Sequence, residues 1–300
     1  VILIGRRGTG KSSLIRAFKN ILPDEVPFLD APLNITEDAL CGSIDIEGTI
    51  KKGKRVFQPG VLSRVDGGFL FIDEINLLNP EIVSIIFEVQ ERGENVVERE
   101  GLSISSPSRF SVLATMNPEE GDISPHILDR FGMCVVFDGV SERRRKIAMK
   151  LHSGVIRIRT RWDRILRERI ESAKNLLGKL ELDDEILSYI TSLSLSLGAF
   201  THRADITLAK AARAYAAFKG DRSVRKEHVD GVLELVMTHR KRSVLPPPEE
   251  EERDGKNERD SEERDTSPSN TTGKAIDLTE TQETGGGREE IFEVGRVFPV

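Results

Sequence analysis

The sequence predicts an α/β protein with a parallel sheet, joined to a helical domain and ending in a polar tail. Over residues 1–139, short apolar runs typical of buried strands alternate with amphipathic helical stretches. Residues 140–245 show helical patterns alone. Residues 246–300 are rich in charged residues, Pro, Ser and Gly, and contain few apolar residues. These observations predict a sheet domain, a helical domain and a disordered linker or tail with those boundaries.

The most specific motif lies at the start of the chain. Four apolar residues run directly into Gly5-Arg6-Arg7-Gly8-Thr9-Gly10-Lys11-Ser12, and an amphipathic stretch from Ser13 to Asn20 follows. The spacing G-x-x-x-x-G-K-S between a strand and a helix is that of a phosphate-binding P-loop. The glycines let successive backbone N–H groups face one centre, and the helix N-terminus adds positive potential. We expect residues 5–13 to bind a polyphosphate, with Lys11 on the β- and γ-phosphates and the Ser12 hydroxyl on Mg²⁺. The alternative is a chance glycine turn with a surface lysine.

A second motif supplies two carboxylates. The apolar run Phe69-Leu70-Phe71-Ile72 ends in Asp73-Glu74, which is typical of a buried parallel strand that delivers acidic side chains to the ligand-binding edge of a sheet. In that setting Asp73 would hold the Mg²⁺ shell through water, and Glu74 would polarise the water that attacks the γ-phosphate. The alternative is a strand that simply ends in an acidic turn.

A third buried strand, Phe110 to Thr115, ends at Met116-Asn117-Pro118. Asn117 would hold the hydrolytic water against the γ-phosphate, and its alternative role is that of a turn-forming Asn before Pro. Residues 22–53 read as loop-rich. The other elements expected in this part are an edge strand near 27–29, a capped helix start at 34–40, a helix at 80–91, a hairpin at 95–104, a short helix at 124–131 and a strand at 133–137.

Composition excludes several classes of protein. No apolar run approaches a membrane span and no signal peptide precedes the first strand, although we expect the sequence to be cut at its N-terminus because Val1 is not Met. Cys41 and Cys134 lie far apart, which predicts buried thiols in a reducing compartment, the cytoplasm or the stroma of a plastid. Five scattered histidines form no zinc pattern.

The charge distribution argues against a nucleic-acid partner. The net charge is −6, but residues 246–300 carry 16 acidic and 7 basic side chains, whereas the rest of the chain carries 34 and 37. The folded part is therefore close to neutral and lacks the concentrated basic face that nucleic-acid binding needs. We expect the basic clusters Arg143-Arg144-Arg145 and Arg240-Lys241-Arg242 to be solvated helix ends.

Together, the P-loop, the strand Phe69 to Glu74, Asn117 and Leu128-Asp129-Arg130-Phe131 resemble the Walker A, Walker B, sensor 1 and arginine-finger motifs of AAA+ ATPases. More narrowly, the chain resembles the ATPase subunits (I/D-type) of magnesium chelatase over residues 1–245. The matching motifs are Ile35-Thr36-Glu37-Asp38, Asp73-Glu74-Ile75-Asn76-Leu77-Leu78, Val97-Glu98-Arg99-Glu100-Gly101, Asn117-Pro118-Glu119-Glu120-Gly121 and Arg130-Phe131-Gly132.

The resemblance implies a motor that binds ATP and Mg²⁺ in a homo-oligomeric, hexameric ring. Hydrolysis would drive insertion of Mg²⁺ into a tetrapyrrole held by a large porphyrin-binding subunit, with D-type subunits as further partners. The implied catalytic residues are Glu74, Asn117, Arg130 and Arg203. Arg130, expected on a short helix at the ligand edge of the sheet, would reach the γ-phosphate of a neighbouring subunit; its alternative is an intrachain pair with Asp129 or Glu120.

Residues 141–245 resemble the helical lid of this family. Helices are expected at 159–180, 183–195, 203–218 and 224–240, and a run of alanines between residues 209 and 217 predicts close helix packing. His202-Arg203-Ala204-Asp205-Ile206 resembles the motif whose arginine, here Arg203, contacts the γ-phosphate as sensor 2. The alternative is a surface salt bridge to Asp205 or Glu185.

Two other functions use the same motor. A MoxR-like chaperone would remodel a protein during metal loading, and an MCM-like helicase would act on DNA. Residues 95–104 carry two acidic residues and one basic residue, which disfavours the helicase because its hairpin would need basic residues. Chelatase and chaperone differ in their partners, which the sequence does not name.

Overall fold

The computed structural model describes residues 1–53, 55–99, 102–137, 161–199 and 201–240, together with residues 146 and 149. All described residues belong to one compact unit within residues 1–247. The boundary expected at 139/140 and the tail expected at 246–300 lie outside the described residues, so both stay predictions.

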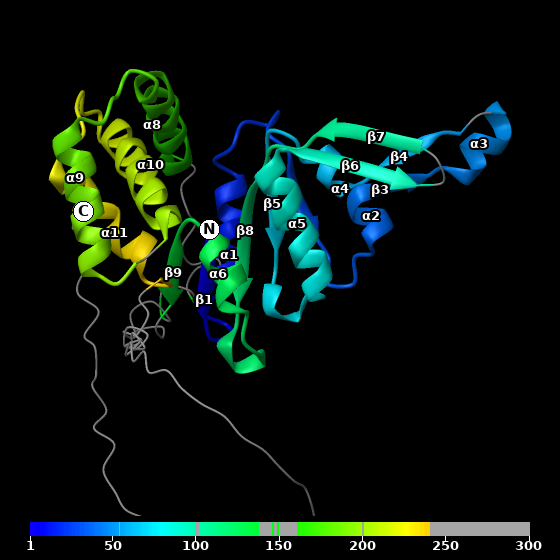
Figure 1. The fold of residues 1–300 in the computed structure, drawn as a ribbon, viewed down its shortest axis with the longest axis horizontal. Coiled ribbons are helices and arrows are strands. Elements are labelled where there is room, and N and C mark those ends of the chain that lie inside the picture. The colour runs from blue at the N-terminus through cyan, green and yellow to red at the C-terminus, as the bar shows by residue number, and fades with distance from the viewer. Residues whose placement is uncertain are drawn as a thin grey trace, which may run out of the picture. The chain divides into compact units, whose positions relative to one another are not determined.

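A five-stranded sheet forms the centre of the N-terminal part (Figure 1). The strands are β1 (Ile2–Gly5), β2 (Phe28–Ala31), β5 (Phe69–Ile72), β8 (Ser111–Met116) and β9 (Cys134–Phe137). Their order is β2-β5-β8-β1-β9, and every neighbouring pair is parallel. This confirms the predicted parallel sheet and its edge strand near residue 28. The three strands that precede the predicted site residues, β1, β5 and β8, are therefore central neighbours.

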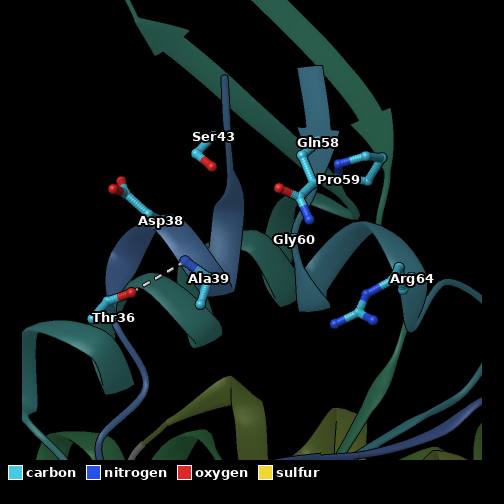
Figure 2. A pocket seen from close by; sticks show the side chains of 8 residues that line it. All are labelled: Thr36, Asp38, Ala39, Ser43, Gln58, Pro59, Gly60 and Arg64. Carbon is cyan, nitrogen blue, oxygen red and sulfur yellow. Dashed lines mark hydrogen bonds between the residues drawn. The ribbon is translucent and has the colours of Figure 1, made fainter. Parts of the chain in front are cut away.

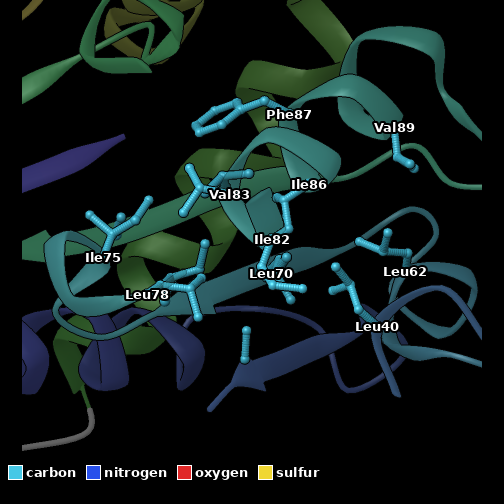
Figure 3. Packing of buried hydrophobic residues seen from close by; sticks show 14 of the residues in the cluster. Leu40, Leu62, Leu70, Ile75, Leu78, Ile82, Val83, Ile86, Phe87 and Val89 are labelled. Atoms are coloured by element: carbon cyan, nitrogen blue, oxygen red, sulfur yellow. The ribbon is translucent and has the colours of Figure 1, made fainter. Parts of the chain in front are cut away.

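Helices cover both faces of the sheet. On one face Ile15 of α1 (Lys11–Lys19) packs with Leu3, Phe71 and Leu113. On the other, α5 (Pro80–Arg92) buries Ile82, Val83, Ile86 and Phe87 in a cluster with Leu70 (Figure 3). Ile72 belongs to the same cluster. Consecutive strand residues thus point to opposite apolar layers, as expected for strands buried on both faces. The Asn79 side chain caps α5, whose Pro80 is at the first helical position.

An insertion between β2 and β5 is more ordered than the sequence suggested. It contains α2 (Glu37–Cys41), β3 (Gly42–Ile44), α3 (Ile46–Lys52), β4 (Phe57–Pro59) and α4 (Val61–Arg64). The capped start of α2 is confirmed, with the Thr36 hydroxyl accepting from the Ala39 amide. The prediction of a loop-rich segment over residues 22–53 is wrong, because β3 pairs with β4, a strand that lies outside that segment, in an antiparallel hairpin. Strand pairing of this kind leaves little trace in local periodicity.

A second hairpin was expected and is present. Strands β6 (Glu94–Arg99) and β7 (Leu102–Pro107) pair antiparallel, directly after α5. Short 3₁₀ turns follow two sheet strands, η1 (Ile75–Leu77) after β5 and η2 (Pro118–Glu120) after β8. Helix α6 (Pro125–Arg130), capped by Ser124, then leads to β9.

The helical region, residues 161–240, contains α8 (Arg161–Leu177), α9 (Asp184–Ser196), α10 (His202–Lys219) and α11 (Lys226–Met237). These match the four predicted helices to within three residues at each end. Helix α10 packs against α8, α9 and α11. Most alanines of the predicted run are buried, as close helix packing requires, namely Ala211, Ala212, Ala216 and Ala217, whereas Ala214 is exposed. None of the helices described in this structure is both long and apolar enough to cross a bilayer.

The end of α11 is attached to the segment between α6 and β9. Arg240, expected at a solvated helix end, is only 7% exposed, and its guanidinium donates to the carbonyls of Phe131 and Gly132. That expectation is wrong because the carbonyls of this turn need donors, which the five N–H groups of an arginine can supply. The neighbouring His239 ring nitrogen Nε2 lies 2.8 Å from the Phe131 carbonyl oxygen.

The expected burial of the two cysteines is confirmed, whereas the reducing compartment stays a prediction. Cys41 and Cys134 are buried free thiols, and burial raises the pKa of each to about 11. Both are therefore protonated and unreactive at neutral pH. Over the described residues, no three His, Cys, Asp or Glu side chains gather as metal ligands.

The junction at His239 predicts a pH-dependent stability. Burial and the adjacent Arg240 lower the pKa of His239 from 6.5 to about 4. The unfolded chain therefore binds a proton before the folded chain does, so stability is lost as the pH falls from about 6.5 towards 4, by up to about 3 kcal/mol. Urea unfolding of the chain across this range should show a steeper decline for the wild type than for His239→Gln. His202, whose side chain is 99% exposed, provides the control: His202→Gln should unfold with the wild-type pH dependence. If the free energy of unfolding of the wild type and of His239→Gln depended on pH in the same way, His239 would not be the responsible group.

Candidate nucleotide-binding site

The P-loop connects β1 to α1 with a backbone that requires glycine. Gly10, the N-cap of α1, has φ +90°, a left-handed conformation that side chains with a Cβ rarely adopt. At Gly5 the reason is different, because an added Cβ would lie 2.7 Å from the carbonyl oxygen of Phe137 in β9. The loop is therefore set by close packing at its start and by backbone conformation at its end.

Lys11 is held inside this loop. Its side chain is buried, and its ammonium group donates to the carbonyls of Gly5 and Arg6. The Thr9 hydroxyl donates to the same Arg6 carbonyl, over 2.8 Å. These carbonyls satisfy the buried charge, which would otherwise be costly. A phosphate bound in the loop would offer the ammonium a charged acceptor in the same place.

The P-loop is hydrogen-bonded to the end of β5. The Ser12 hydroxyl donates to Asp73 Oδ1 over 2.7 Å, although 61 residues separate them in sequence. Thr115, at the end of β8, donates to the same oxygen over 2.6 Å. The sequence prediction that Ser12 and Asp73 share one site is therefore consistent with their direct contact.

Glu74 adopts an unusual backbone conformation. Its φ of +57° is the only positive value among non-glycine residues of the described chain. Its backbone N–H donates to the Thr115 hydroxyl over 2.9 Å, so one threonine fixes both carboxylate-bearing residues. Such strain persists only where surrounding contacts enforce it and is concentrated at functional sites.

Asn117 follows β8 directly beside the P-loop, since Met116 pairs with Ile4. It is 2% exposed, and its side-chain oxygen accepts from the Glu119 amide at 3.3 Å. The turn-forming role considered from the sequence is thus present, and it leaves the side-chain NH₂ as the group that would donate to a ligand. Asn76, in η1, donates to the carbonyls of Asn117 and Gly121 at 3.2 Å each, which ties the turn after β5 to the turn after β8.

These residues fit a nucleoside triphosphate with Mg²⁺. Ser12 and Asp73 place a hydroxyl and a carboxylate oxygen within contact distance, and oxygen donors are what Mg²⁺ prefers. Glu74 and Asn117 follow the two strands nearest to β1 on that side of the sheet. The carboxyl edge of the sheet, where the strands end, therefore carries all predicted site residues except two.

Arg130 is one of the two. Its predicted place at the ligand edge is wrong, because α6 ends only three residues before β9 begins and therefore approaches the opposite, amino edge. Its guanidinium carbon lies 5.9 Å from the centre of the Phe87 ring, and Nη2 is 3.5 Å from His126 Nε2. Neither pair considered from the sequence is observed, since Asp129 binds Arg240. Arg130 has no contact with the P-loop of its own chain.

Arg203 is the other. It pairs with Glu91 at 2.8 Å, rather than with Asp205 or Glu185. Glu91 lies in the last turn of α5 and lines a pocket with Phe69 and Ser111, the first residues of β5 and β8. Arg203 thus lies at the amino edge of the sheet, away from its own P-loop, and the structure does not support contact with phosphates bound in the same chain. Arg203 and Glu91 are 112 residues apart in the sequence, so no local pattern predicts that they pair.

A pocket of about 630 Å³ lies away from this site (Figure 2). It is lined by residues of the insertion, among them Thr36, Asp38, Gln58 and Arg64. No P-loop residue contributes to it. A phosphate site built from backbone N–H groups of an open loop does not need an enclosed cavity, so the geometry of the loop locates the nucleotide better than pocket size does.

Thr115 and Asn76 are site residues that sequence reasoning missed. The sequence pattern groups Thr115 with the apolar strand that it ends, although its buried hydroxyl bonds to Asp73 and to the Glu74 amide at the end of β5. The strand register would reveal this contact. Ile72 of β5 pairs with Ala114 of β8, and the next residues on the two parallel strands are Asp73 and Thr115. The register itself, however, is not readable from the sequence.

Family comparisons agree with this geometry. A family model described as AAA domain (dynein-related subfamily) matches residues 1–131, and one described as AAA lid domain matches residues 187–264. The magnesium-chelatase 38 kDa subunit of Chlorobaculum parvum is 34% identical over 289 residues, covering 81% of this chain and 84% of that protein. The magnesium-chelatase subunit ChlI homolog of Methanocaldococcus jannaschii is 32% identical, covering 83% and 80%. A crystal structure from Cytophaga hutchinsonii, 18% identical, shares the fold with a TM-score of 0.58 over 80% of this chain and 77% of that one.

The Thr115 contacts predict a catalytic defect without loss of nucleotide binding. Thr115→Val keeps the shape of the side chain but removes both hydrogen bonds, so Asp73 and Glu74 lose their common support. We expect a loss of about 1–3 kcal/mol in stability and a fall of about tenfold or more in kcat, because small misplacements of catalytic groups are costly. Urea unfolding measures the stability and steady-state hydrolysis measures kcat. Titration with a fluorescent ATP analogue measures the nucleotide affinity, which should stay at the wild-type value. Thr191→Val, which removes a hydroxyl bonded only to a helix carbonyl, should change none of these, and wild-type kcat for Thr115→Val would refute the role.

Proposed function

Because the chain belongs to the family of AAA+ ATPase subunits of magnesium chelatase, we propose that it hydrolyses ATP at the P-loop edge to drive metal insertion into a tetrapyrrole. The observation that carries this proposal is the Ser12–Asp73 hydrogen bond. It joins the P-loop to the acidic strand end at the place where Mg²⁺ and the triphosphate would share ligands.

The chemistry assigned to the site residues follows from their positions. The loop from Gly5 to Ser13 would bind the phosphates, with Lys11 moving its ammonium from backbone carbonyls to phosphate oxygens. Ser12 and Asp73 would hold Mg²⁺, Asp73 through water. When bound, Mg²⁺ neutralises charge on the phosphate oxygens.

Glu74 would accept a proton from the attacking water while the oxygen of that water forms a bond to the γ-phosphorus. The bond from that phosphorus to the bridging oxygen breaks, which yields ADP and phosphate. Asn117 would orient the water through its side-chain NH₂. The strained backbone of Glu74 and the Thr115 bonds hold these groups in place before the substrate arrives, which lowers the reorganisation needed during the reaction.

The partners are part of the proposal. We assign this chain to a homo-oligomeric ring, a hexamer, that acts with D-type subunits and a large porphyrin-binding subunit in the cytoplasm or the plastid stroma. The large subunit would hold the tetrapyrrole while the metal is inserted. The similar proteins are named as magnesium-chelatase subunits, which favours this function over a MoxR-like chaperone or an MCM-like helicase.

Two substitutions separate binding from hydrolysis. Lys11→Ala should abolish productive phosphate binding, because it removes the buried ammonium. Glu74→Gln should keep ATP binding but slow hydrolysis by about 100-fold or more, since only the proton acceptor is lost. Equilibrium binding and phosphate release measure the two properties. Glu88→Gln, at a surface ion pair on α5, is the matched control, and equal turnover by wild type and Glu74→Gln would exclude the assigned base.

Arg130 would act on a neighbouring subunit. It lies away from its own P-loop, and in a head-to-tail ring the face that bears it meets the P-loop face of the next copy. An arginine supplied in trans stabilises charge on the transferred phosphoryl group and contributes about 10³–10⁵ in rate. The location towards the amino edge favours this role over one in the same chain.

A mixing experiment tests the trans role. Arg130→Ala subunits keep Glu74 but lack the finger, and Glu74→Gln subunits keep the finger but lack the base. Each alone should hydrolyse ATP poorly, whereas a mixture should recover part of the activity at interfaces that join an intact finger to an intact base. Arg92→Ala, at an exposed ion pair, should behave as the wild type. Full activity of Arg130→Ala alone, independent of protein concentration, would rule out the finger.

A further inference from the structure

The helical region holds the backbone that carries Arg130. Arg240, which follows the end of α11, donates from Nη2 to the carbonyls of Asp129 and Phe131 at 3.0 and 2.7 Å. From Nη1 it donates to the Gly132 carbonyl at 3.1 Å, and from Nε to the Asp129 carboxylate at 3.0 Å. One guanidinium therefore binds the residues on both sides of Arg130.

Arg240 is built into this position. It is 7% exposed, and Nη1 also donates to the Val236 carbonyl at 2.7 Å, which fixes it to the last turns of its own helix. His239 adds a further contact to the Phe131 carbonyl. The opposing charge, Asp129, is the residue directly before Arg130. An arginine suits this place because its planar, rigid fork satisfies several acceptors at once, which a lysine ammonium does not.

The Arg130 side chain is held much less firmly. Its recorded contacts are a 3.5 Å approach to His126 and a 5.9 Å approach to the Phe87 ring. Among the described residues, its buried Nε has no hydrogen-bond partner. The orientation of the Arg130 side chain therefore depends on the backbone from Asp129 to Gly132. This backbone is held in place by the hydrogen bonds from Arg240 of the helical region.

We propose that Arg240 is a positioning residue for Arg130, so that the helical region of one subunit controls the rate of ATP hydrolysis in the neighbouring subunit. This inference rests on the proposed function, since it requires Arg130 to act in trans. A shift of α11 relative to β9 would move the Asp129-to-Gly132 backbone with it, because four hydrogen bonds from Arg240 connect them. The helical region of the subunit that supplies Arg130 would thus be coupled to the phosphates bound in the neighbouring subunit.

The test uses Arg240→Lys in the full chain. Lysine keeps a positive charge opposite the partly buried Asp129 carboxylate, but it cannot bind the same set of carbonyls. We expect ATP affinity within about twofold of wild type and a fall of about 10- to 100-fold in kcat, as for a misplaced catalytic group. Arg225→Lys is the control, because Arg225 makes only an exposed pair with Asp221 in the same region, and its kcat should be unchanged.

Complementation distinguishes positioning from general damage. Arg240→Lys subunits keep Lys11 and Glu74, so mixing them with Glu74→Gln subunits, whose finger is intact, should restore hydrolysis. Mixing them with Arg130→Ala subunits should not raise activity above the sum of the two, because both lack a working finger. A residue with a merely structural role would damage the acceptor function as well and would not be rescued by Glu74→Gln.

Several results would overturn the inference. Wild-type kcat for Arg240→Lys, failure of Glu74→Gln subunits to rescue it, or rescue by Arg130→Ala subunits would each do so. If thermal unfolding shows that Arg240→Lys does not fold, Asp129→Asn, which keeps the carbonyl contacts and removes the charged one, takes its place in the same mixtures. Full activity of Arg130→Ala alone would instead refute the trans finger, and with it this inference. The two failures are therefore distinguishable.

Discussion

The parallel pairing of β8 with β1 on one side and β5 on the other is the constraint on which the site depends. Because parallel strands end at the same edge, this pairing brings the P-loop, Asp73, Glu74 and Asn117 together from three distant parts of the sequence. The register is as important as the order. It places Thr115 opposite Asp73, so that one hydroxyl can bind a carboxylate and a backbone amide at once. A shift of one residue would turn Thr115 to the other face of the sheet.

Hydrogen bonds within the chain organise the site. The Ser12 and Thr115 hydroxyls orient Asp73, Asn76 connects the turns after β5 and β8, and the backbone of Glu74 is held in a conformation that costs of order 1–3 kcal/mol for a residue other than glycine. The apolar layers on both faces of the sheet supply the rigidity that sustains this cost. Lys11 is the part of the site that must change its partners, from carbonyls to phosphates.

The two arginines implied by the family resemblance lie away from this edge. Arg203 is bound to Glu91 and Arg130 lies towards the amino edge, so neither completes the nucleotide site of its own chain. A single subunit thus carries, at this edge, the residues proposed to bind phosphate and Mg²⁺ and to activate water, but no arginine from these two positions. This division of labour is physically consistent with a motor whose hydrolysis depends on assembly, and the Arg240 contacts show how the helical region is connected to the part that a neighbour would use.

The sequence by itself determined the fold class, the P-loop, the acidic strand end and most of the helices, because these depend on local patterns. Glycine spacing, apolar runs that end in carboxylates, and helical periodicity are properties of adjacent residues. It failed for the β3–β4 hairpin, for Arg240 and for the partners of Arg130 and Arg203. These depend on contacts between residues far apart in the chain, such as Arg240 with Asp129 or Arg203 with Glu91. Only the tertiary structure decided them, because a long charged side chain takes its partner from whichever acceptors the fold leaves within reach, and local sequence does not specify those.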